Sequence, residues 1–313
     1  MNELTLLHES LVDESEIDSL GHMNVRFYVS RAANANFALL EKLGIKAGPS
    51  ESLRRMDTYN RFHKEQFAGA RLGVFGGLIT VEGSLGVTGY YEIRNLDSEA
   101  IAASFIITTN LIDTSSESIK PLPSVAENIL SPFQVVVPEY SQPRSLNLVP
   151  PRQVSLEEIS TLIPYDSKPG SINGRRQGVI LKEDCDADGR LNENVDPMFV
   201  LFRPQPGEDL KNIGPPVQRD EQGRRYSFAM MEIRSINFHR PGQGDTIVSF
   251  SADVEYGEKW RRTRRWIFAK DSGVLLGISD HAAVCMDLDA RRAIPIPADI
   301  RLDMEQNSLP DHG

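Results

Sequence analysis

The 313-residue sequence is poor in cysteine, in basic side chains and in long hydrophobic runs. Its two cysteines, Cys185 and Cys285, form neither a CxxC pair nor a metal-ligand spacing, so we expect two free thiols and no metal site. No stretch approaches the ~18 uninterrupted apolar residues of a membrane helix. The first residues lack the basic start and apolar run of a signal peptide. We therefore expect a cytoplasmic protein without membrane association.

The charge balance argues against nucleic-acid binding. Forty-four acidic and 34 basic side chains give a net charge of −10, whereas nucleic-acid binding needs a basic face. Forty per cent of the residues are apolar and 25% are charged, which is typical of a globular protein. At roughly 100–200 residues per domain, the length predicts two domains.

The strongest helix signal lies over residues 25–43, where apolar side chains recur every three or four positions. Asn24 suits the N-cap position and Gly44 the position after the helix. Strand-like runs with glycines between them follow at 72–95 and 100–113. No long helix interrupts these runs, so antiparallel pairing is expected. One buried helix followed by antiparallel strands predicts an α+β fold.

The middle of the chain is rich in proline. Residues 124–171 contain seven prolines, and within them residues 155–163 predict one short helix with a capping box from Ser155 to Glu158. We interpret this segment as a connection between an N-terminal domain, 1–123, and a C-terminal domain, 172–313. Strand-like runs resume in the C-terminal domain.

The two halves share a motif. Residues 18–24 and 186–192 both have the pattern D-x-x-G-[HR]-x-N, at an offset of 186 − 18 = 168. Further landmarks recur at offsets of 174 and 175, which predicts a duplicated domain with one insertion, most simply within 207–225.

Residues 17–28 carry a recognisable resemblance. The run from Glu16 to Tyr28 resembles the motif D-x-D-x-x-G-H-x-N-N-x-x-Y of the 4-hydroxybenzoyl-CoA thioesterase family of the hotdog superfamily. Matching positions are Asp18, Gly21, His22, Asn24 and Tyr28, while Glu16 replaces the first acid and Val25 the second asparagine. The resemblance implies two tandem hotdog domains, each a long central helix wrapped by a curved antiparallel β-sheet. It also implies an internal pseudo-dimer and assembly into a homodimer or larger homo-oligomer.

The chemistry implied by this resemblance is hydrolysis of an acyl-CoA or acyl-carrier-protein thioester. Asp18 would be the nucleophile or the general base, and amides at the helix N-terminus near Asn24 would stabilise the oxyanion. His22 would orient the loop or take part in acid–base chemistry. Gly21 would permit a positive φ or a close approach of substrate, and Val25 and Tyr28 would line the substrate pocket. Coenzyme A would be part of the substrate, with no retained cofactor.

The second copy of the motif is degenerate. It keeps Asp186, Gly189 and Asn192, but Arg190 stands at the position of His22. Prolines at 197, 204 and 206 follow, so we expect a short helix there and an inactive second site. The C-terminal half would then supply pocket walls and pairing surface.

A basic run at 259–268, KWRRTRRWIF, has two interpretations. As a strand it places Arg262 and Arg264 on one face, either in an exposed, charge-balanced strand or in contact with coenzyme A phosphates. Two alternative functions stay open at this point. They are a non-catalytic acyl-thioester binding or scaffold protein, and a hotdog dehydratase or hydratase, although the motif of the latter group is absent.

Overall fold

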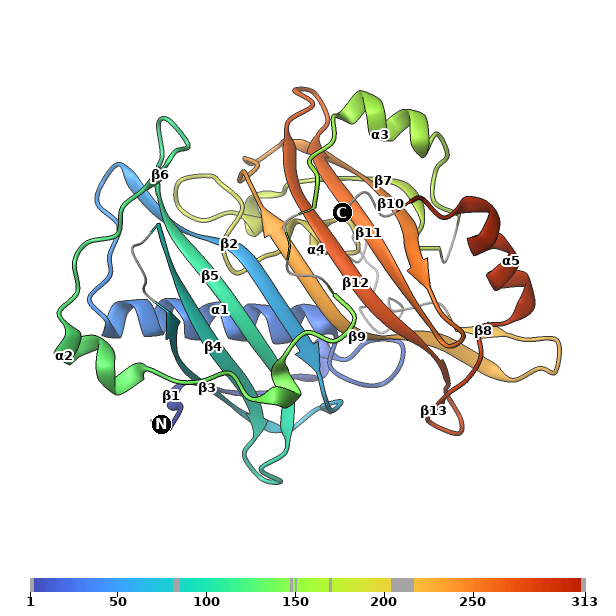
Figure 1. Ribbon diagram of the computed structural model, residues 1–313, viewed down its shortest axis with the longest axis horizontal. Coiled ribbons are helices and arrows are strands. Elements are labelled where there is room, and N and C mark those ends of the chain that lie inside the picture. Colours follow the sequence, from blue (N-terminus) through green and yellow to red (C-terminus); the bar gives the residue numbers. More distant parts are fainter. Residues whose placement is uncertain are drawn as a thin grey trace. The chain divides into compact units, whose positions relative to one another are not determined.

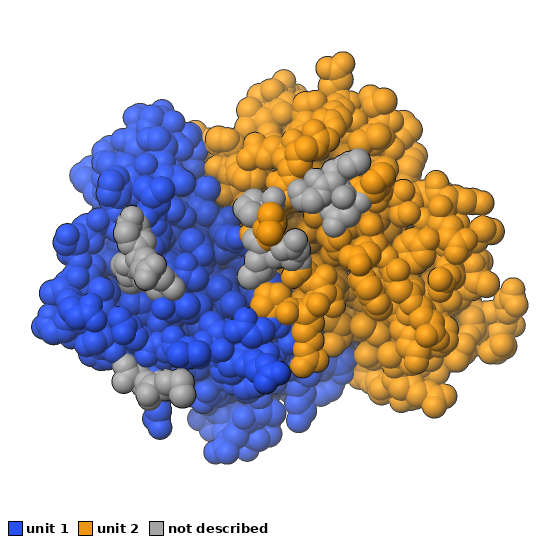
Figure 2. Space-filling view, viewed as in Figure 1, with its two compact units in different colours: residues 1–142, 193–196, 209–211 blue, residues 143–192, 197–208, 212–313 orange. Residues whose placement is uncertain are grey.

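The computed structural model describes residues 3–80, 85–146, 149, 151–168, 171–203 and 217–310. The chain divides into two compact units (Figure 2). Of the described residues, unit 1 contains 3–142 and 193–196, and unit 2 contains the others. The proline-rich segment 124–171 is therefore shared, because its first part, through Gln142, belongs to unit 1 and its second part to unit 2.

Unit 1 is built on an antiparallel sheet with the strand order β1-β3-β4-β5-β2 (Figure 1). A two-residue strand, β6, pairs with β5. The strands of unit 1 are β1 (Thr5–Leu11), β2 (Glu51–Phe62), β3 (Arg71–Thr80), β4 (Gly86–Asn95), β5 (Ile101–Asp113) and β6 (Ile119–Lys120). Its short helices are η1 (Glu14–Glu16), α2 (Glu127–Leu130), η2 (Ser131–Phe133) and η3 (Glu139–Ser141).

The helix predicted over 25–43 is present as α1 (Val25–Lys42), which packs against β1, β3, β4 and β5 of unit 1. It begins at Asn24, whose Oδ1 accepts a hydrogen bond from the Arg26 N–H at 3.2 Å. Asn36 fixes the helix on the sheet, because it donates to Thr109 Oγ1 at 2.9 Å and accepts from Tyr91 Oη at 2.8 Å. These buried bonds satisfy polar groups that would otherwise be costly in an apolar core.

Unit 2 has a sheet with the order β7-β10-β11-β12-β9, in which β13 pairs with β12 and β8 with β9. If β7 is equated with β1 and β10 with β3, the order matches that of unit 1 strand for strand. The strands of unit 2 are β7 (Gly174–Val179), β8 (Gln218–Arg219), β9 (Arg225–Asn237), β10 (Thr246–Tyr256), β11 (Trp260–Ala269), β12 (Leu275–Asp287) and β13 (Arg292–Ala293). Its helices are α3 (Leu156–Leu162), η4 (Lys182–Asp184), α4 (Pro197–Val200) and α5 (Ala298–Asn307).

Helix α3 is the short helix expected at 155–163, and Ser155 caps it by accepting a hydrogen bond from the Glu158 N–H at 3.1 Å. Its buried Ile159, together with Ile163, packs on Phe250, Trp266 and Phe268. This cluster covers one face of the unit 2 sheet.

The short helix expected after the second motif is α4, with only four residues. The described part of unit 2 therefore lacks the long central helix that the resemblance implied for each half. Pro197 is tolerated there because the first helical residue needs no intrahelical N–H bond. Pro204, Pro206 and most of the insertion expected in 207–225 lie outside the described residues. No helix in the described part of the chain is long and apolar enough to cross a membrane.

Candidate active site

Residues 17–23 form a tight turn that leads into α1. Ile17 and Met23 pair across it in an antiparallel bridge, the Asp18 N–H donates to His22 O at 3.0 Å, and the Gly21 N–H donates to Asp18 O at 2.9 Å. Gly21 has φ +81, and a Cβ there would meet nothing within 4 Å. Of the two roles expected for Gly21, the positive φ is therefore the one that the structure requires.

The turn holds the carboxylate of Asp18 in a buried position. Oδ1 accepts a hydrogen bond from the Leu20 N–H at 2.9 Å, and Oδ2 accepts one from Asn24 Nδ2 at 3.1 Å. Burial raises the pKa of Asp18, against the opposing effects of His22 and of these hydrogen bonds. A carboxylate with a raised pKa is a stronger base than an exposed one.

Asn24 joins this carboxylate to the start of α1. Its Nδ2 donates to Asp18, while its Oδ1 accepts from the Arg26 N–H. The two bonds fix which way the amide faces. No described residue accepts a hydrogen bond from the N–H of Val25, the first residue of α1. A free N–H at the positive end of a helix, beside a buried carboxylate, is an arrangement that can bind a developing oxyanion.

His22 lies between two carboxylates of unit 1. Its Nδ1 is 3.9 Å from Asp18 Oδ1, and its Nε2 is 3.4 Å from Glu65 Oε1. Glu65 belongs to the loop between β2 and β3 and was not predicted from the sequence. Gln66 anchors this loop, because its backbone O accepts from the Met23 N–H at 2.8 Å. Its Oε1 also accepts from Asn95 Nδ2, at 2.8 Å.

Tyr28 and Glu16 make buried contacts next to the turn. Tyr28 is buried edge-on against Phe62 with ring centroids 5.5 Å apart, and burial raises its pKa. Glu16 forms an ion pair with the buried Arg31 at 2.8 Å. These contacts fix α1 relative to the turn. The role of Tyr28 in lining a substrate pocket stays a prediction, and Asp18 and Glu65 both act electrostatically on its hydroxyl.

The second motif copy reproduces the backbone of this turn. The Asp186 N–H donates to Arg190 O at 3.0 Å, the Gly189 N–H to Asp186 O at 3.1 Å, and Gly189 has φ +74. The Leu191 N–H donates to Pro241 O at 2.9 Å, which corresponds to the Met23 bond to Gln66 at an offset of 241 − 66 = 175. The repeat seen in the sequence therefore extends to individual backbone hydrogen bonds.

The side chains around Asp186 differ from those around Asp18. Arg240 stands at the position of Glu65, since 240 − 65 = 175, and forms ion pairs with Asp186 and, at 3.5 Å, with Asp188. Burial and the neighbouring Asp188 raise the pKa of Asp186, and Arg240 opposes them. The Asp186 side chain is 34% exposed, against 3% for Asp18. No helix begins at Asn192, because α4 starts at Pro197.

Arg262 and Arg264 do not lie on an exposed strand face, which corrects that part of the sequence expectation, although their charges are balanced as one interpretation expected. Both are buried in β11. Arg264 makes a two-pronged contact with Asp280, at 2.7 and 2.9 Å, and Arg262 contacts Glu255 and Asp280 at 3.1 and 3.6 Å. The acids lie on the neighbouring strands β10 and β12, so pairing across the sheet neutralises these guanidinium groups.

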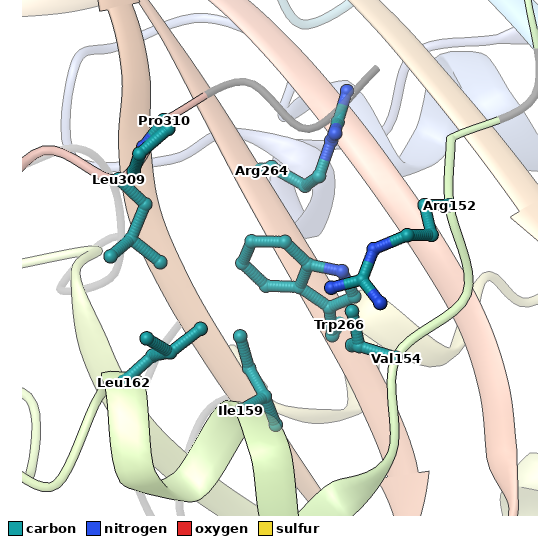
Figure 3. Close-up of a pocket in the computed structure, with 8 residues that line it drawn as sticks. All are labelled: Arg152, Val154, Ile159, Leu162, Arg264, Trp266, Leu309 and Pro310. Atoms are coloured by element: carbon teal, nitrogen blue, oxygen red, sulfur yellow. The ribbon is translucent and has the colours of Figure 1, made fainter.

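Arg264 also borders a small cavity in unit 2 (Figure 3). The cavity measures about 40 Å³, far below the roughly 300–1,000 Å³ of a ligand pocket. It can hold water but not an acyl chain or a nucleotide. Its lining residues are Arg152, Val154, Ile159, Leu162, Arg264, Trp266, Leu309 and Pro310.

The described residues contain no group of three or more His, Cys, Asp or Glu side chains placed to hold a metal ion. Cys185 and Cys285 are both free thiols. Burial raises the pKa of both, to about 11 for Cys285, so neither is a poised nucleophile.

Solved structures that are similar to this chain over most of its length include three thioesterases. A protein assigned as an oleoyl thioesterase from Lactobacillus plantarum has a TM-score of 0.55 and 10% identity, covering 94% of this chain and 98% of its own. The 12:0-ACP thioesterase from Umbellularia californica has a TM-score of 0.57 and 9% identity, covering 89% and 93%. An acyl-ACP thioesterase from Bacteroides thetaiotaomicron VPI-5482 has a TM-score of 0.55 and 9% identity, covering 89% and 96%.

The chain has a hotdog-type fold. The three similar structures are thioesterases of that type, and the antiparallel sheets described above fit it. At 9–10% identity the similarity establishes the fold and no activity. No protein-family model matches the sequence, and a search of curated proteins gives no match.

Proposed function

We propose that this chain is an acyl thioester hydrolase made of two tandem hotdog domains, with its working site in unit 1. One observation supports this most strongly. The buried Asp18 carboxylate is held by Asn24 beside the N-terminus of α1, where no described residue accepts a hydrogen bond from the Val25 N–H. A base and an oxyanion donor side by side are the two requirements of acyl transfer to water.

In this mechanism the thioester carbonyl oxygen would accept a hydrogen bond from the Val25 N–H. Asp18 would then act in one of two ways. It would attack the carbonyl carbon and form an anhydride that water later hydrolyses, or it would remove a proton from an attacking water molecule. In both routes the C–S bond breaks, and the thiolate takes up a proton as it leaves.

His22 and Glu65 would control the charge next to Asp18. A histidine 3.9 Å from one carboxylate and 3.4 Å from another can carry a proton between them or hold the turn in place. The helix start would supply most of the oxyanion stabilisation. Removing one such donor typically costs about 3–4 kcal/mol of transition-state stabilisation.

The second copy would not hydrolyse thioesters. Asp186 is paired with Arg240, is partly exposed and has no helix N-terminus at Asn192. We propose that unit 2 supplies structure to the chain instead. Assembly into homodimers or larger oligomers, and a cytoplasmic location, remain predictions.

The proposed substrates are thioesters of coenzyme A or of acyl carrier protein. Two of the similar structures are named as acyl-ACP thioesterases, which supports including carrier-protein thioesters. Coenzyme A or the carrier would be a product of the reaction and not a resident cofactor.

The test is a free-thiol release assay on the full chain. Short, long and aromatic acyl groups are offered on coenzyme A and on acyl carrier protein, and Asp18→Asn serves as the matched control. We expect release well above the background rate for at least one substrate and none above background for the variant. Tight binding of a thioester without hydrolysis would instead favour the non-catalytic binding protein.

A further inference from the structure

Tyr28 lies about one helical turn after the start of α1 in unit 1. Residues three positions apart lie on the same face of an α-helix, so Tyr28 shares a face with Val25. Long side chains in a helix lean toward its N-terminal end. The phenol ring therefore directs its hydroxyl back toward the helix start, where no described residue accepts a hydrogen bond from the Val25 N–H.

The contacts of Tyr28 agree with this direction. Its ring packs edge-on against Phe62, with ring centroids 5.5 Å apart and an interplanar angle of 77°. Phe62 is the last residue of β2 and leads into the loop that carries Glu65 and Gln66. The backbone N–H of Gln66 serves the hydroxyl as a hydrogen-bond donor, and both Glu65 and Asp18 act on it electrostatically. The hydroxyl therefore lies beside the turn that holds the proposed base.

The hydrogen of this hydroxyl is available to a ligand. No described residue accepts a hydrogen bond from it, although two carboxylates act on it. Burial, together with Glu65 and Asp18, raises the pKa of Tyr28, so the hydroxyl stays protonated at neutral pH. Packing in the core requires only the ring, which phenylalanine would also supply. The side chain thus presents a neutral O–H donor at the helix start.

The second copy of the motif has no such donor. Asp196 stands at the position of Tyr28, since 196 − 28 = 168. An ionised carboxylate accepts hydrogen bonds and donates none. The copy that we propose to be inactive therefore lacks both a helix that begins at Asn192 and this hydroxyl.

We propose that Tyr28 is a catalytic residue that donates a second hydrogen bond to the thioester carbonyl oxygen. This inference rests on the proposed hydrolysis of thioesters in unit 1. As the nucleophile adds to the carbonyl carbon, the π electron pair of the C=O bond moves onto the oxygen. The oxygen would then accept from both the Val25 N–H and the Tyr28 O–H. Both donors keep their protons when the oxyanion collapses and the C–S bond breaks.

The first measurement compares thiol release by the native chain and by Tyr28→Phe. The substrates carry butyryl, lauroyl or benzoyl groups on coenzyme A and on acyl carrier protein. The variant keeps its ring against Phe62, so Tm should be unchanged and KM should stay within about threefold, while kcat should fall by about 10². Tyr91→Phe is the matched control. It removes a buried hydroxyl that donates to Asn36 at 2.8 Å, so it should lower Tm and leave kcat within about twofold.

The second measurement does not depend on turnover. Asp18→Asn serves as the host, and the infrared stretching band of a ¹³C-labelled carbonyl is recorded for each bound thioester. Hydrogen bonds to the carbonyl oxygen lower the frequency of this band. Adding Tyr28→Phe to the host should reverse part of that lowering, because one of two donors is lost. Adding Tyr91→Phe should leave the band in place.

The outcomes separate this inference from the proposed function. Equal kcat values in the native chain and in Tyr28→Phe, or an unchanged carbonyl band, would overturn the role of Tyr28 while hydrolysis stands. A native chain that binds a thioester but releases no thiol would overturn the proposed hydrolysis, and a band that Tyr28→Phe shifts would show that Tyr28 still binds the carbonyl. A chain that neither binds nor hydrolyses any of these thioesters would overturn both.

Discussion

Replacing each motif aspartate with asparagine separates the chemistry of unit 1 from that of unit 2. Asp18→Asn keeps the shape of the side chain and removes its negative charge. The new amide oxygen can still accept from the Leu20 N–H, but its NH2 group would face the NH2 group of Asn24. One hydrogen bond is lost at about 1 kcal/mol, while removal of a buried charge offsets that loss. The free energy of unfolding should change by less than about 1 kcal/mol.

The catalytic effect should be far larger than the effect on stability. A carboxamide at position 18 can neither attack a thioester nor accept a proton from water, so kcat should fall by at least about 10². Asp186→Asn weakens a partly exposed ion pair, and Arg240 keeps its hydrogen bond to Leu191 O at 2.8 Å. For this variant kcat should change less than about fivefold.

Both variants are assayed by thiol release on the best substrate of the native chain, with kcat and KM determined separately. Thermal unfolding checks that each variant is folded. Equal losses from the two substitutions would mean that both sites work. An inactive Asp186→Asn beside an active Asp18→Asn would place the active site in unit 2 and refute the reasoning from burial and from the helix start.

Three further predictions follow from the same contacts. Glu65→Gln removes a negative charge that raises the pKa of Asp18, so the acidic limb of the kcat/KM profile should move to lower pH; an unmoved limb would show that Glu65 does not act on Asp18. Gly21→Ala and Gly189→Ala each place a side chain at positive φ without a clash, so both should lose about 1–2 kcal/mol of stability in urea unfolding, but only the first should lower kcat. Burial and the nearby arginines hold the pKa of His281 well below its usual value, so it is neutral in the folded chain and accepts a proton on unfolding below pH about 6.5. The free energy of unfolding of the native chain should therefore fall by about 1.4 kcal/mol per pH unit between pH 6 and 5, relative to that of His281→Asn. Parallel curves of unfolding free energy against pH for the two proteins would contradict this buried, neutral state.

The local features of unit 1 were predictable because short-range rules determine them. The three- and four-residue spacing of apolar side chains predicts α1, and Asn24 and Gly44 mark its two ends. The D-x-x-G pattern predicts a turn, because the glycine is needed at a positive φ. The nearly constant offsets of 174 and 175 between later landmarks predict the equivalence of the two sheets.

The contacts that depend on distant residues were not predictable. Glu65 reaches His22 only because β2 returns the chain to the turn after the whole of α1. The repeat offset could have indicated it, since Glu65 and Arg240 are equivalent positions with opposite charges. Likewise, the sequence places Arg262 and Arg264 on one strand face but not beside Asp280, which lies on β12. The strand expected to be exposed is therefore buried, and its charges are balanced by acids on the neighbouring strands.

The backbone turn is necessary for the proposed site but is not sufficient. Both units form it with the same hydrogen bonds, yet only in unit 1 does it lead directly into a helix. We therefore consider the double substitution Arg190→His and Arg240→Glu, made in an Asp18→Asn background. It should give Asp186 the same charged neighbours as Asp18 has, but thiol release should stay at background. The reason is that the oxyanion donor is missing, because Asn192 caps no helix. The same two substitutions in the native background should leave kcat within about twofold, which controls for damage to the fold. Release above background in the triple variant would show that the charges alone, without a helix N-terminus, are enough for catalysis.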